Sequence, residues 1–245
     1  MHKIVTILLT HQSAEKVEKM LKYWRAQDVN QYFIVAHGGE LDRPESSADY
    51  WVKIADPLLR TKDHPRERQS YLGVFAATAP LIKELGATHV HLAEFDEIPL
   101  VNNLNQKLLG VIEHENCDVL GHCLRRVDDT TSPHYMDHQK DAAFATYWAS
   151  ISKRKETEVV LSMLGCGSFW RYEVFAAVAK LAPPMRIYLE LFLPTAAHHL
   201  GYRVRPMPPT QDVFMDPEKT RRIEDLEICK RQGAWRLHPV KDMWG

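Results

Sequence analysis

The sequence predicts an α/β fold, in which helices cover both faces of one mostly parallel sheet to give a three-layer α/β/α sandwich. Three observations support this prediction. Apolar runs without alternation recur along the chain, as expected of strands that are buried on both faces. Segments with apolar residues at helical spacing follow these runs. Glycine or proline marks several of the boundaries between them.

Size and charge narrow the class of protein. The chain has 245 residues, of which 45% are hydrophobic and 26% charged, so it can bury the core of one ordinary globular domain. We expect a single domain over residues 1–245. With 31 basic and 32 acidic residues the formal net charge is -1, so no overall field attracts nucleic acid, and we expect no nucleic-acid partner.

The cysteines and the amino-terminal segment predict the compartment. The four cysteines show neither a C-x-x-C pair nor zinc spacing, and we interpret them as reduced thiols. The apolar run at residues 4–9 is interrupted by Thr6 and is too short for a signal peptide or a membrane span. We therefore expect a cytoplasmic protein with no integral membrane segment.

The first part of the chain predicts a strand, a helix and a second strand. Residues 3–10 read as a buried strand, and Ser13 is the expected N-cap of the helix that follows. The apolar positions of this helix recur at helical spacing up to Arg25: Val17, Met20, Leu21 and Trp24. The second strand, residues 32–36, stops at His37-Gly38-Gly39. Such an opening indicates a Rossmann-like sheet.

The later elements continue the alternation of strands and helices. We expect a short third strand at residues 50–55, a long helix at about 67–85, a fourth strand at 89–95, a helix at 106–115 and a fifth strand at 118–124. Residues 125–155 are polar and irregular, which predicts a partly mobile excursion on the surface. Two further helices are expected at residues 174–181 and 187–200.

The most informative segment is an apolar strand that runs directly into acidic residues, His89-Val90-His91-Leu92-Ala93-Glu94-Phe95-Asp96-Glu97. Unpaired carboxylates are costly inside an apolar sheet, so we expect these acids at its carboxyl edge, where open α/β sheets bind ligands. Glu94 and Asp96 are two residues apart and can point the same way, which suits a hard cation such as Mg²⁺ or Mn²⁺. A solvated acidic turn is the alternative interpretation.

Glu94-Phe95-Asp96-Glu97 resembles the D-x-D motif of GT-A glycosyltransferases, especially those of the family 2 type. The runs Ile7-Leu8-Leu9-Thr10-His11-Gln12-Ser13 and Phe33-Ile34-Val35-Ala36-His37-Gly38-Gly39 are also similar to that family. The resemblance implies a GT-A fold, a nucleotide-sugar donor, a glycan or small-molecule acceptor, and Mn²⁺ or Mg²⁺ as cofactor. It also implies a nucleotide-binding half at about residues 1–116 and an acceptor-binding half at about 117–245.

The same resemblance assigns roles around the donor. Asp96 should be a metal ligand, with Glu94 near the ribose or on the metal. The other positions that it places against the nucleotide-sugar are Thr10, His11, His37 and Gly38. This sequence departs from the family by having Glu94 as the first acid of the motif and His37 where family 2 members usually have a base-binding aspartate. The nucleotide base is therefore not predicted.

Arg68 is a further candidate for binding the donor phosphates. It lies at the start of the expected long helix, where the backbone N–H groups of a helix N-terminus favour an anion. A solvated charged turn explains this arginine equally well.

The run Gly165-Cys166-Gly167-Ser168-Phe169-Trp170 resembles the glycine-containing acceptor segment that precedes a helix in these enzymes. Gly167 permits close approach of the backbone, and Trp170 offers a flat apolar face on which a sugar ring could stack. These two residues are our candidates for the acceptor site. The alternative is a tight turn into a helix, with Trp170 in the core.

Glu190 is the candidate catalytic base. It is the only charge in the apolar stretch Ile187-Tyr188-Leu189-Glu190-Leu191-Phe192-Leu193, and a partly desolvated carboxylate there is prepared for general-base chemistry. The family resemblance implies a similar acid on a helix in inverting GT-A enzymes, followed by a run like Gly201-Tyr202-Arg203-Val204. A structural pair of Glu190 with Arg186 or His198 is the alternative.

A late basic segment provides candidates for completing the site. The resemblance implies a histidine that returns to the metal, for which His238 is the candidate, and a cation on the diphosphate, for which Lys241 is the candidate. Imidazole suits a transition metal, and a lysine offsets the charge that develops on the leaving group. A structural role for His238 is the alternative.

Two other functions are compatible with the predicted sheet. A nucleotidyltransferase also uses carboxylates and Mg²⁺, but it should carry a glycine-rich phosphate loop after the first strand, and Thr10-His11-Gln12-Ser13 has no glycine. A sugar-binding or nucleotide-binding protein with a degenerate site is the non-enzymatic alternative. Glycosyl transfer with inversion at the anomeric carbon is the function that the sequence favours.

Overall fold

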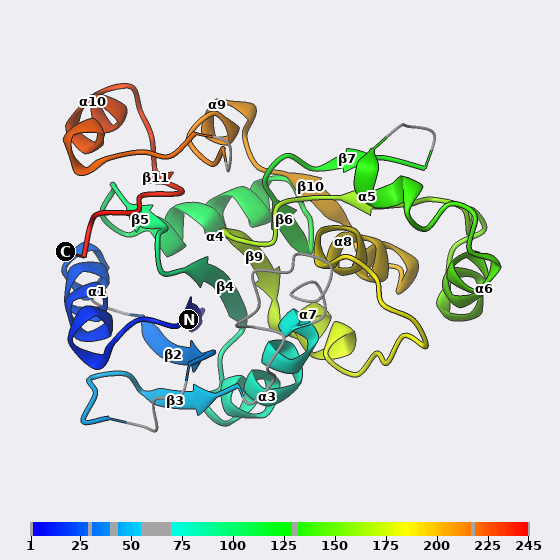
Figure 1. Ribbon diagram of the computed structural model, residues 1–245, viewed down its shortest axis with the longest axis horizontal. Helices are drawn as coiled ribbons and strands as arrows, with labels where there is room; N and C mark the ends of the chain where they lie inside the picture. Colours follow the sequence, from blue (N-terminus) through cyan, green and yellow to red (C-terminus); the bar gives the residue numbers. More distant parts are fainter. Residues whose placement is uncertain are drawn as a thin grey trace.

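The computed structural model describes residues 2–28, 31–39, 44–54, 70–128, 132–216 and 219–244. Within these residues a central sheet has the strand order β10-β6-β9-β4-β1-β2-β3 (Figure 1). Its strands are β1 (Ile4–Thr10), β2 (Tyr32–His37), β3 (Tyr50–Lys53), β4 (His89–Glu94), β6 (Val119–Gly121), β9 (Ser168–Arg171) and β10 (Val204–Pro206).

The pairing of these strands is mostly parallel, as the sequence predicts. Strand β1 pairs in parallel with β2 and β4, β2 with β3, and β6 with β10. Strand β9 lies between β4 and β6 and is antiparallel to both. The register sets Thr10 opposite His37 and Leu9 opposite Glu94, so the carboxyl ends of β1, β2 and β4 meet at one edge of the sheet.

Helices cover both faces of the sheet and complete the predicted three-layer sandwich. Alternate residues of β1 point to opposite faces, because Ile4 and Leu8 belong to one hydrophobic cluster and Val5 and Ile7 to the other. The first cluster includes α1 (Ala14–Gln27) and α4 (Leu104–His114). The second includes α3 (Ser70–Glu84), α7 (Tyr172–Val178) and α8 (Leu189–His199). Both faces are apolar, which explains the continuous apolar runs in the sequence.

Most of the predicted elements are confirmed within a few residues of their expected ends. Strands β1 to β4 and helices α1, α4, α7 and α8 all occur where the patterns place them. Ser13 is the N-cap of α1, although its side chain makes no capping hydrogen bond. The expected long helix is described from Ser70 onward as α3, and its predicted beginning lies outside the described residues.

Two elements differ from the sequence prediction. Strand β9 forms where we expected a turn into a helix, because four residues beside a glycine-rich loop carry little strand signal. The expected irregular stretch contains the short helix α5 (Pro133–Met136) and the helix α6 (Ala142–Ile151). Asp141 caps α6 by accepting a hydrogen bond from the backbone N–H of Ala143 at 2.9 Å, and the helix buries Phe144, Tyr147 and Trp148. The sequence contains both the capping aspartate and the apolar positions that indicate this helix.

The fifth predicted strand is also shorter than expected. Strand β6 ends at Gly121, and the chain then forms β7 (Arg125–Arg126), which pairs with β8 (Leu161–Ser162) away from the central sheet. The reason is the turn at residues 122–124, in which Cys123 has a positive φ of 52°.

The last part of the chain returns to the carboxyl end of β4. After α9 (Pro209–Asp212), a 3-10 turn (Ile223–Asp225) and α10 (Leu226–Arg231), strand β11 (Arg236–Leu237) pairs with β5 (Ile98–Pro99), just beyond β4 (Figure 1). The backbone N–H of Val240 donates to the carbonyl of Asp96 at 2.9 Å. None of the described helices is long and apolar enough to cross a membrane.

Two buried histidines predict that the fold loses stability in mild acid. Burial lowers the pKa of both His89 and His122 to about 4, from an ordinary value of 6.5. Between about pH 4 and pH 6.5, the unfolded chain therefore binds more protons at these two histidines than the folded protein does. The stability that depends on these two neutral histidines is complete above about pH 6.5. It decreases as the pH falls toward 4, by at most about 1.4 kcal/mol per pH unit for each histidine.

Urea unfolding at about pH 7 and about pH 5 measures this loss. The variant His89→Gln has one neutral buried imidazole fewer, so its free energy of unfolding should change less between the two conditions than that of the parent. An equal pH dependence for the two proteins would contradict the assignment to His89.

Candidate functional site

The carboxyl edge of β1, β2 and β4 brings several predicted donor-site residues together. The backbone N–H of Gly38 donates to the carbonyl of Thr10 at 2.9 Å, which joins the loops after β1 and β2. His11 follows β1 and packs edge-on against Phe95, with 4.9 Å between the ring centroids. Phe95 belongs to the acidic turn after β4. The three loops therefore form one continuous rim.

His37 has a structural task at this rim. The backbone N–H of Gly39 donates to its Nδ1 at 3.0 Å, so Nε2 carries the proton and donates to the carbonyl of Gln12 at 2.9 Å. The ring is buried and stacks on Trp51, with 5.1 Å between the centroids. Both ring nitrogens bond to backbone groups, so His37 fixes the shape of the loops after β1 and β2.

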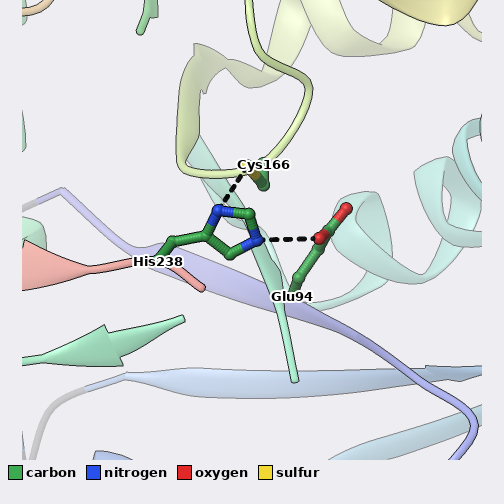
Figure 2. Close-up of side chains that lie close together, drawn as sticks. All are labelled: Glu94, Cys166 and His238. Carbon is green, nitrogen blue, oxygen red and sulfur yellow. Dashed lines mark hydrogen bonds and ion pairs between the residues drawn. The ribbon is translucent and has the colours of Figure 1, made fainter. Parts of the chain in front are cut away.

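The acidic turn after β4 meets the late basic segment, as Figure 2 shows for Glu94 and His238. Nε2 of His238 lies 3.2 Å from Oε2 of Glu94 and 3.3 Å from Oδ1 of Asp96. Nζ of Lys241 forms an ion pair with Oδ2 of Asp96. The four residues Glu94, Asp96, His238 and Lys241, which the sequence assigns to one site, thus lie in direct contact.

The charges of this group are balanced within it. Burial raises the pKa of the Asp96 carboxyl, but His238 and Lys241 outweigh burial and hold it below its ordinary value. For His238, burial lowers the pKa, but the Cys166 sulfur and the carboxylates of Asp96 and Glu94 outweigh it, and the pKa is raised. Asp96 is 1% exposed, and among the described residues its Oδ1 has the ion-pair contact with His238 but no well-aligned hydrogen bond.

Cys166 lies on the other side of the same imidazole. Its Sγ is 3.5 Å from Nδ1 of His238, and one ligand atom from each of Glu94, Cys166 and His238 lies within 4.8 Å of the other two (Figure 2). Burial raises the pKa of the thiol to about 12. Cys166 reaches this position because the N–H groups of Leu164 and Gly167 donate to the carbonyls of His122 and Leu92, at 2.9 Å and 2.8 Å.

A buried arginine holds the late segment beneath the site. The side chain of Arg236 is 2% exposed, and its Nη1 donates to Oε1 of Glu97 at 3.0 Å and to Nε2 of His91 at 2.6 Å. Its Nη2 donates to Nε2 of His122 at 2.7 Å and to the carbonyl of Gly167 at 2.6 Å. Burial raises the pKa of Glu97, but Arg236 outweighs it and brings the value down to about 2.

The network continues across the sheet with one consistent direction of donation. Since His91 accepts at Nε2, its Nδ1 donates to Oδ1 of Asn105 at 2.9 Å. The amide of Asn105 then donates to Thr6 at 3.1 Å and to Gln31 at 2.8 Å. On the other branch, Nδ1 of His122 donates to Oδ1 of Asp212 at 2.7 Å. The groups named in this paragraph thus have partners, whereas Oε2 of Glu97 is buried and accepts no hydrogen bond from the described residues.

The two candidates for the acceptor site lie in the interior. Gly167 has a φ of +67°, and a Cβ placed there would meet Cε of Met215 at 2.7 Å and Cζ of Arg236 at 3.1 Å. The close approach that its lack of a side chain permits is therefore to Arg236. Trp170 is fully buried, and its Nε1 donates to Ser168 at 2.9 Å. The prediction that Trp170 stacks on a sugar is wrong, because its ring packs in the core against Phe75.

Glu190 lies in the first turn of α8, beside the segment that carries Cys166. Its carbonyl accepts a hydrogen bond from the backbone N–H of Met163 at 3.0 Å, and its side chain is half-buried. Burial and several nearby acids, one of which is Glu190, raise the pKa of the Cys123 thiol to about 11. Arg68, the remaining candidate, lies outside the described residues.

Sequence reasoning missed Cys166 and Arg236 as parts of the site. Cys166 stands in the glycine-containing run that we quoted, but a single cysteine carries no spacing signal. Arg236 stands two residues before His238 and resembles any surface arginine in sequence. Its burial follows from its partners, Glu97 above all, which only the fold brings near.

Comparisons with known proteins identify the fold. No protein-family model and no curated protein matches the chain by sequence. Among solved structures, the WbbM bifunctional glycosyltransferase superposes on 98% of this chain and 46% of its own, with a TM-score of 0.51 and 10% identity. At that identity the likeness concerns the fold alone. The chain has a fold of the GT-A type.

Two further structures show a weaker likeness. They are the bifunctional IspDF from Campylobacter jejuni (8% identity, 84% of this chain and 49% of that chain, TM-score 0.45) and 2-C-methyl-D-erythritol 4-phosphate cytidylyltransferase from Thermus thermophilus (13%, 94% and 98%, TM-score 0.46). The chain spans about half the length of the WbbM and IspDF chains.

The close contact of Gly167 with Arg236 predicts a specific cost of substitution. Gly167→Ala should lower the free energy of unfolding by more than the roughly 1–2 kcal/mol of left-handed backbone strain, because the new methyl group also displaces Arg236 or Met215. Gly233→Ala is the matched control, since Gly233 has a φ of +86° and nothing within 4 Å of its added Cβ. Denaturant titration measures both, and equal costs would contradict the close approach.

Proposed function

We propose that this chain is a metal-assisted glycosyltransferase that moves a sugar from a nucleotide-sugar to a glycan or small-molecule acceptor. The observation that carries the proposal is the contact of Glu94, Asp96, His238 and Lys241 at the carboxyl edge of β4. This edge is where an open α/β sheet binds its ligand. The division into a nucleotide-binding half, about 1–116, and an acceptor-binding half, about 117–245, belongs to the same proposal.

The residues at this edge fit a divalent cation. Two carboxylates face one imidazole nitrogen, and the distances of 3.2 Å and 3.3 Å match the separation of about 3 Å between neighbouring ligands of an octahedral ion. The Oδ1 atom of Asp96 is buried, and its contact with His238 is an ion pair without a well-aligned hydrogen bond, which leaves this oxygen suited to a metal ligand. The mixed nitrogen and oxygen donors favour Mn²⁺ over Mg²⁺. When bound, such an ion neutralises the diphosphate of the donor.

Lys241 is placed to contact the donor phosphates. Its side chain is 55% exposed and its ammonium lies at the outer oxygen of Asp96. A phosphate oxygen that approaches Asp96 can therefore contact the Lys241 ammonium without a large movement of the lysine side chain. Lys241 would then offset the charge of the departing nucleoside diphosphate. Thr10, His11 and Gly38 supply the neighbouring rim, and the contact of His11 with Phe95 links that rim to the acidic turn.

Glu190 is the proposed general base of the acceptor half. It lies at the beginning of α8, and the Met163 contact ties it to the segment that ends at Cys166 and Gly167. A carboxylate there can accept the proton of an acceptor hydroxyl as the oxygen attacks the anomeric carbon. Direct attack inverts the configuration of the sugar. The four cysteines are all free, in agreement with the proposed cytoplasmic location.

The metal site predicts metal-dependent binding of nucleotides. In a thermal-shift screen of nucleoside diphosphates, at least one should stabilise the parent protein more with Mn²⁺ than without it, since a ligand of the folded state raises stability by mass action. Asp96→Asn should weaken this Mn²⁺-dependent affinity at least about tenfold.

Asp242→Asn is the control for this experiment. Asp242 is an exposed acid next to Lys241, so the substitution removes the same charge near the site without removing a ligand. Equal affinities of the parent and Asp96→Asn would contradict the proposed site.

The proposed base predicts a separation of binding from turnover. Glu190→Gln should keep the Mn²⁺-dependent nucleotide affinity and lower kcat by about 10²–10⁴-fold with the nucleotide-sugar that the screen selects. Glu173→Gln, an exposed position on α7, should leave kcat unchanged. NMR of the product sugar measures its anomeric configuration, and retention would show that direct displacement with Glu190 as base is wrong.

A further inference from the structure

The imidazole of His238 faces two chemically different sets of ligands. Its Nε2 faces the oxygens of Glu94 and Asp96. Its Nδ1 faces the sulfur of Cys166, and Figure 2 shows Glu94 and Cys166 at the two different ring nitrogens. The oxygen side is the proposed site of the hard cation. The sulfur side has no part in that function, and a thiol is a weak acceptor for an imidazole N–H. A buried thiol at this place therefore calls for another explanation.

The geometry on the sulfur side is that of two neighbouring ligands of a tetrahedral metal. With metal–sulfur and metal–nitrogen bonds of about 2.3 and 2.1 Å, a tetrahedral angle separates sulfur and nitrogen by about 3.6 Å. The observed distance from Sγ of Cys166 to Nδ1 of His238 is 3.5 Å. The backbone holds Cys166 in place through the hydrogen bond from Gly167 to Leu92, so this distance is set by the fold.

A third possible ligand, Glu94, lies beside the same imidazole, at its other ring nitrogen. The ligand atoms of Glu94, Cys166 and His238 all lie within 4.8 Å of one another. The Glu94 side chain is 27% exposed, and its carboxylate faces Nε2, so joining a metal at Nδ1 requires a rotation about its own torsions toward the sulfur. Cysteine, histidine and glutamate provide three ligands, which leaves the fourth position of a tetrahedral ion for water or a ligand.

We propose that Glu94, Cys166 and His238 bind a sulfur-seeking divalent transition metal, of the class of Zn²⁺ and Co²⁺. Thiolate ligands select such ions over Mg²⁺ and Mn²⁺, which prefer oxygen. Binding forms the metal–sulfur and metal–nitrogen bonds, and the protons of the Cys166 thiol and of His238 Nδ1 leave to solvent. This proposal adds a second metal to the site of the proposed function. It rests on the proposed function only because both ions would use Glu94 and His238.

Sharing these two residues makes the two ions competitors. If both bound at once, the imidazole would bridge two divalent cations and Glu94 would have to face both. The sulfur-seeking ion should therefore displace Mn²⁺ from the oxygen side. The fraction of the site occupied by Mn²⁺ would then fall as the concentration of the sulfur-seeking ion rises.

Co²⁺ titration of the whole chain tests this proposal, with Co²⁺ alone as the probe. A thiolate bound to Co²⁺ gives a charge-transfer absorption band in the near ultraviolet, and tetrahedral Co²⁺ gives intense visible bands. We expect both in the parent. Cys166→Ser should lose the charge-transfer band and weaken Co²⁺ binding at least about tenfold. Cys123→Ser, which removes the exposed cysteine of the described chain, should keep both features.

Mn²⁺ binding, measured by electron paramagnetic resonance, separates this proposal from the proposed function. We expect Cys166→Ser to bind Mn²⁺ like the parent and to resist its displacement by Zn²⁺. A parent that binds Co²⁺ without a charge-transfer band would overturn the proposal and leave the oxygen site intact, and a band that persists in Cys166→Ser would also overturn it. Should Cys166→Ser fail to fold, cadmium-113 NMR of the parent decides, because its chemical shift reports whether sulfur is a ligand.

Discussion

The buried Arg236 guanidinium is the constraint on which the arrangement of the site depends. A cation that is 2% exposed must be paired and hydrogen-bonded, since the unpaired charge would cost several kcal/mol. Its partners come from the turn after β4, from β4 itself, from the end of β6 and from the loop before β9. One side chain thus ties the late segment to three strands, and this tie brings His238 and Lys241 to Asp96.

The protonation states of this network follow from the same cation. His91 and His122 both accept a hydrogen bond from Arg236 at Nε2, so each must be neutral with its proton on Nδ1. His238, two residues further on, faces carboxylates and has a raised pKa. Neighbouring histidines therefore have opposite tendencies: burial, reinforced by Arg236, outweighs the nearby acids and lowers the pKa of His91 and His122, whereas the groups around His238 outweigh its burial. The buried charges of the network are the Arg236–Glu97 pair, with the Asp212 carboxylate at its partly exposed end, while Glu94, Asp96, His238 and Lys241 lie at the rim.

The sequence was sufficient for the features that rest on strong local patterns. Strands β1, β2 and β4 are buried on both faces, so their apolar runs are unmistakable, and the acids that follow β4 can lie only at its end. Strand β9 and helix α6 escaped prediction because one is very short and the other lies in a stretch rich in polar residues. The error at Trp170 has another cause, since a tryptophan after a glycine-rich run looks the same whether its ring faces a ligand or the core. Burial of Trp170 and Arg236 is a property of partners distant in sequence.

The long return of the chain has a consequence for biosynthesis. Lys241 meets Asp96 across 145 positions of sequence, and Arg236 meets Glu97 across 139. A nascent polypeptide that has reached residue 235 has every strand of the central sheet, but it still lacks Arg236, His238 and Lys241, the basic partners that the described residues supply to the acidic turn. The contacts of Glu94, Asp96 and Glu97 with this closing segment therefore form only after the rest of the described chain has been synthesised, as the closing segment docks.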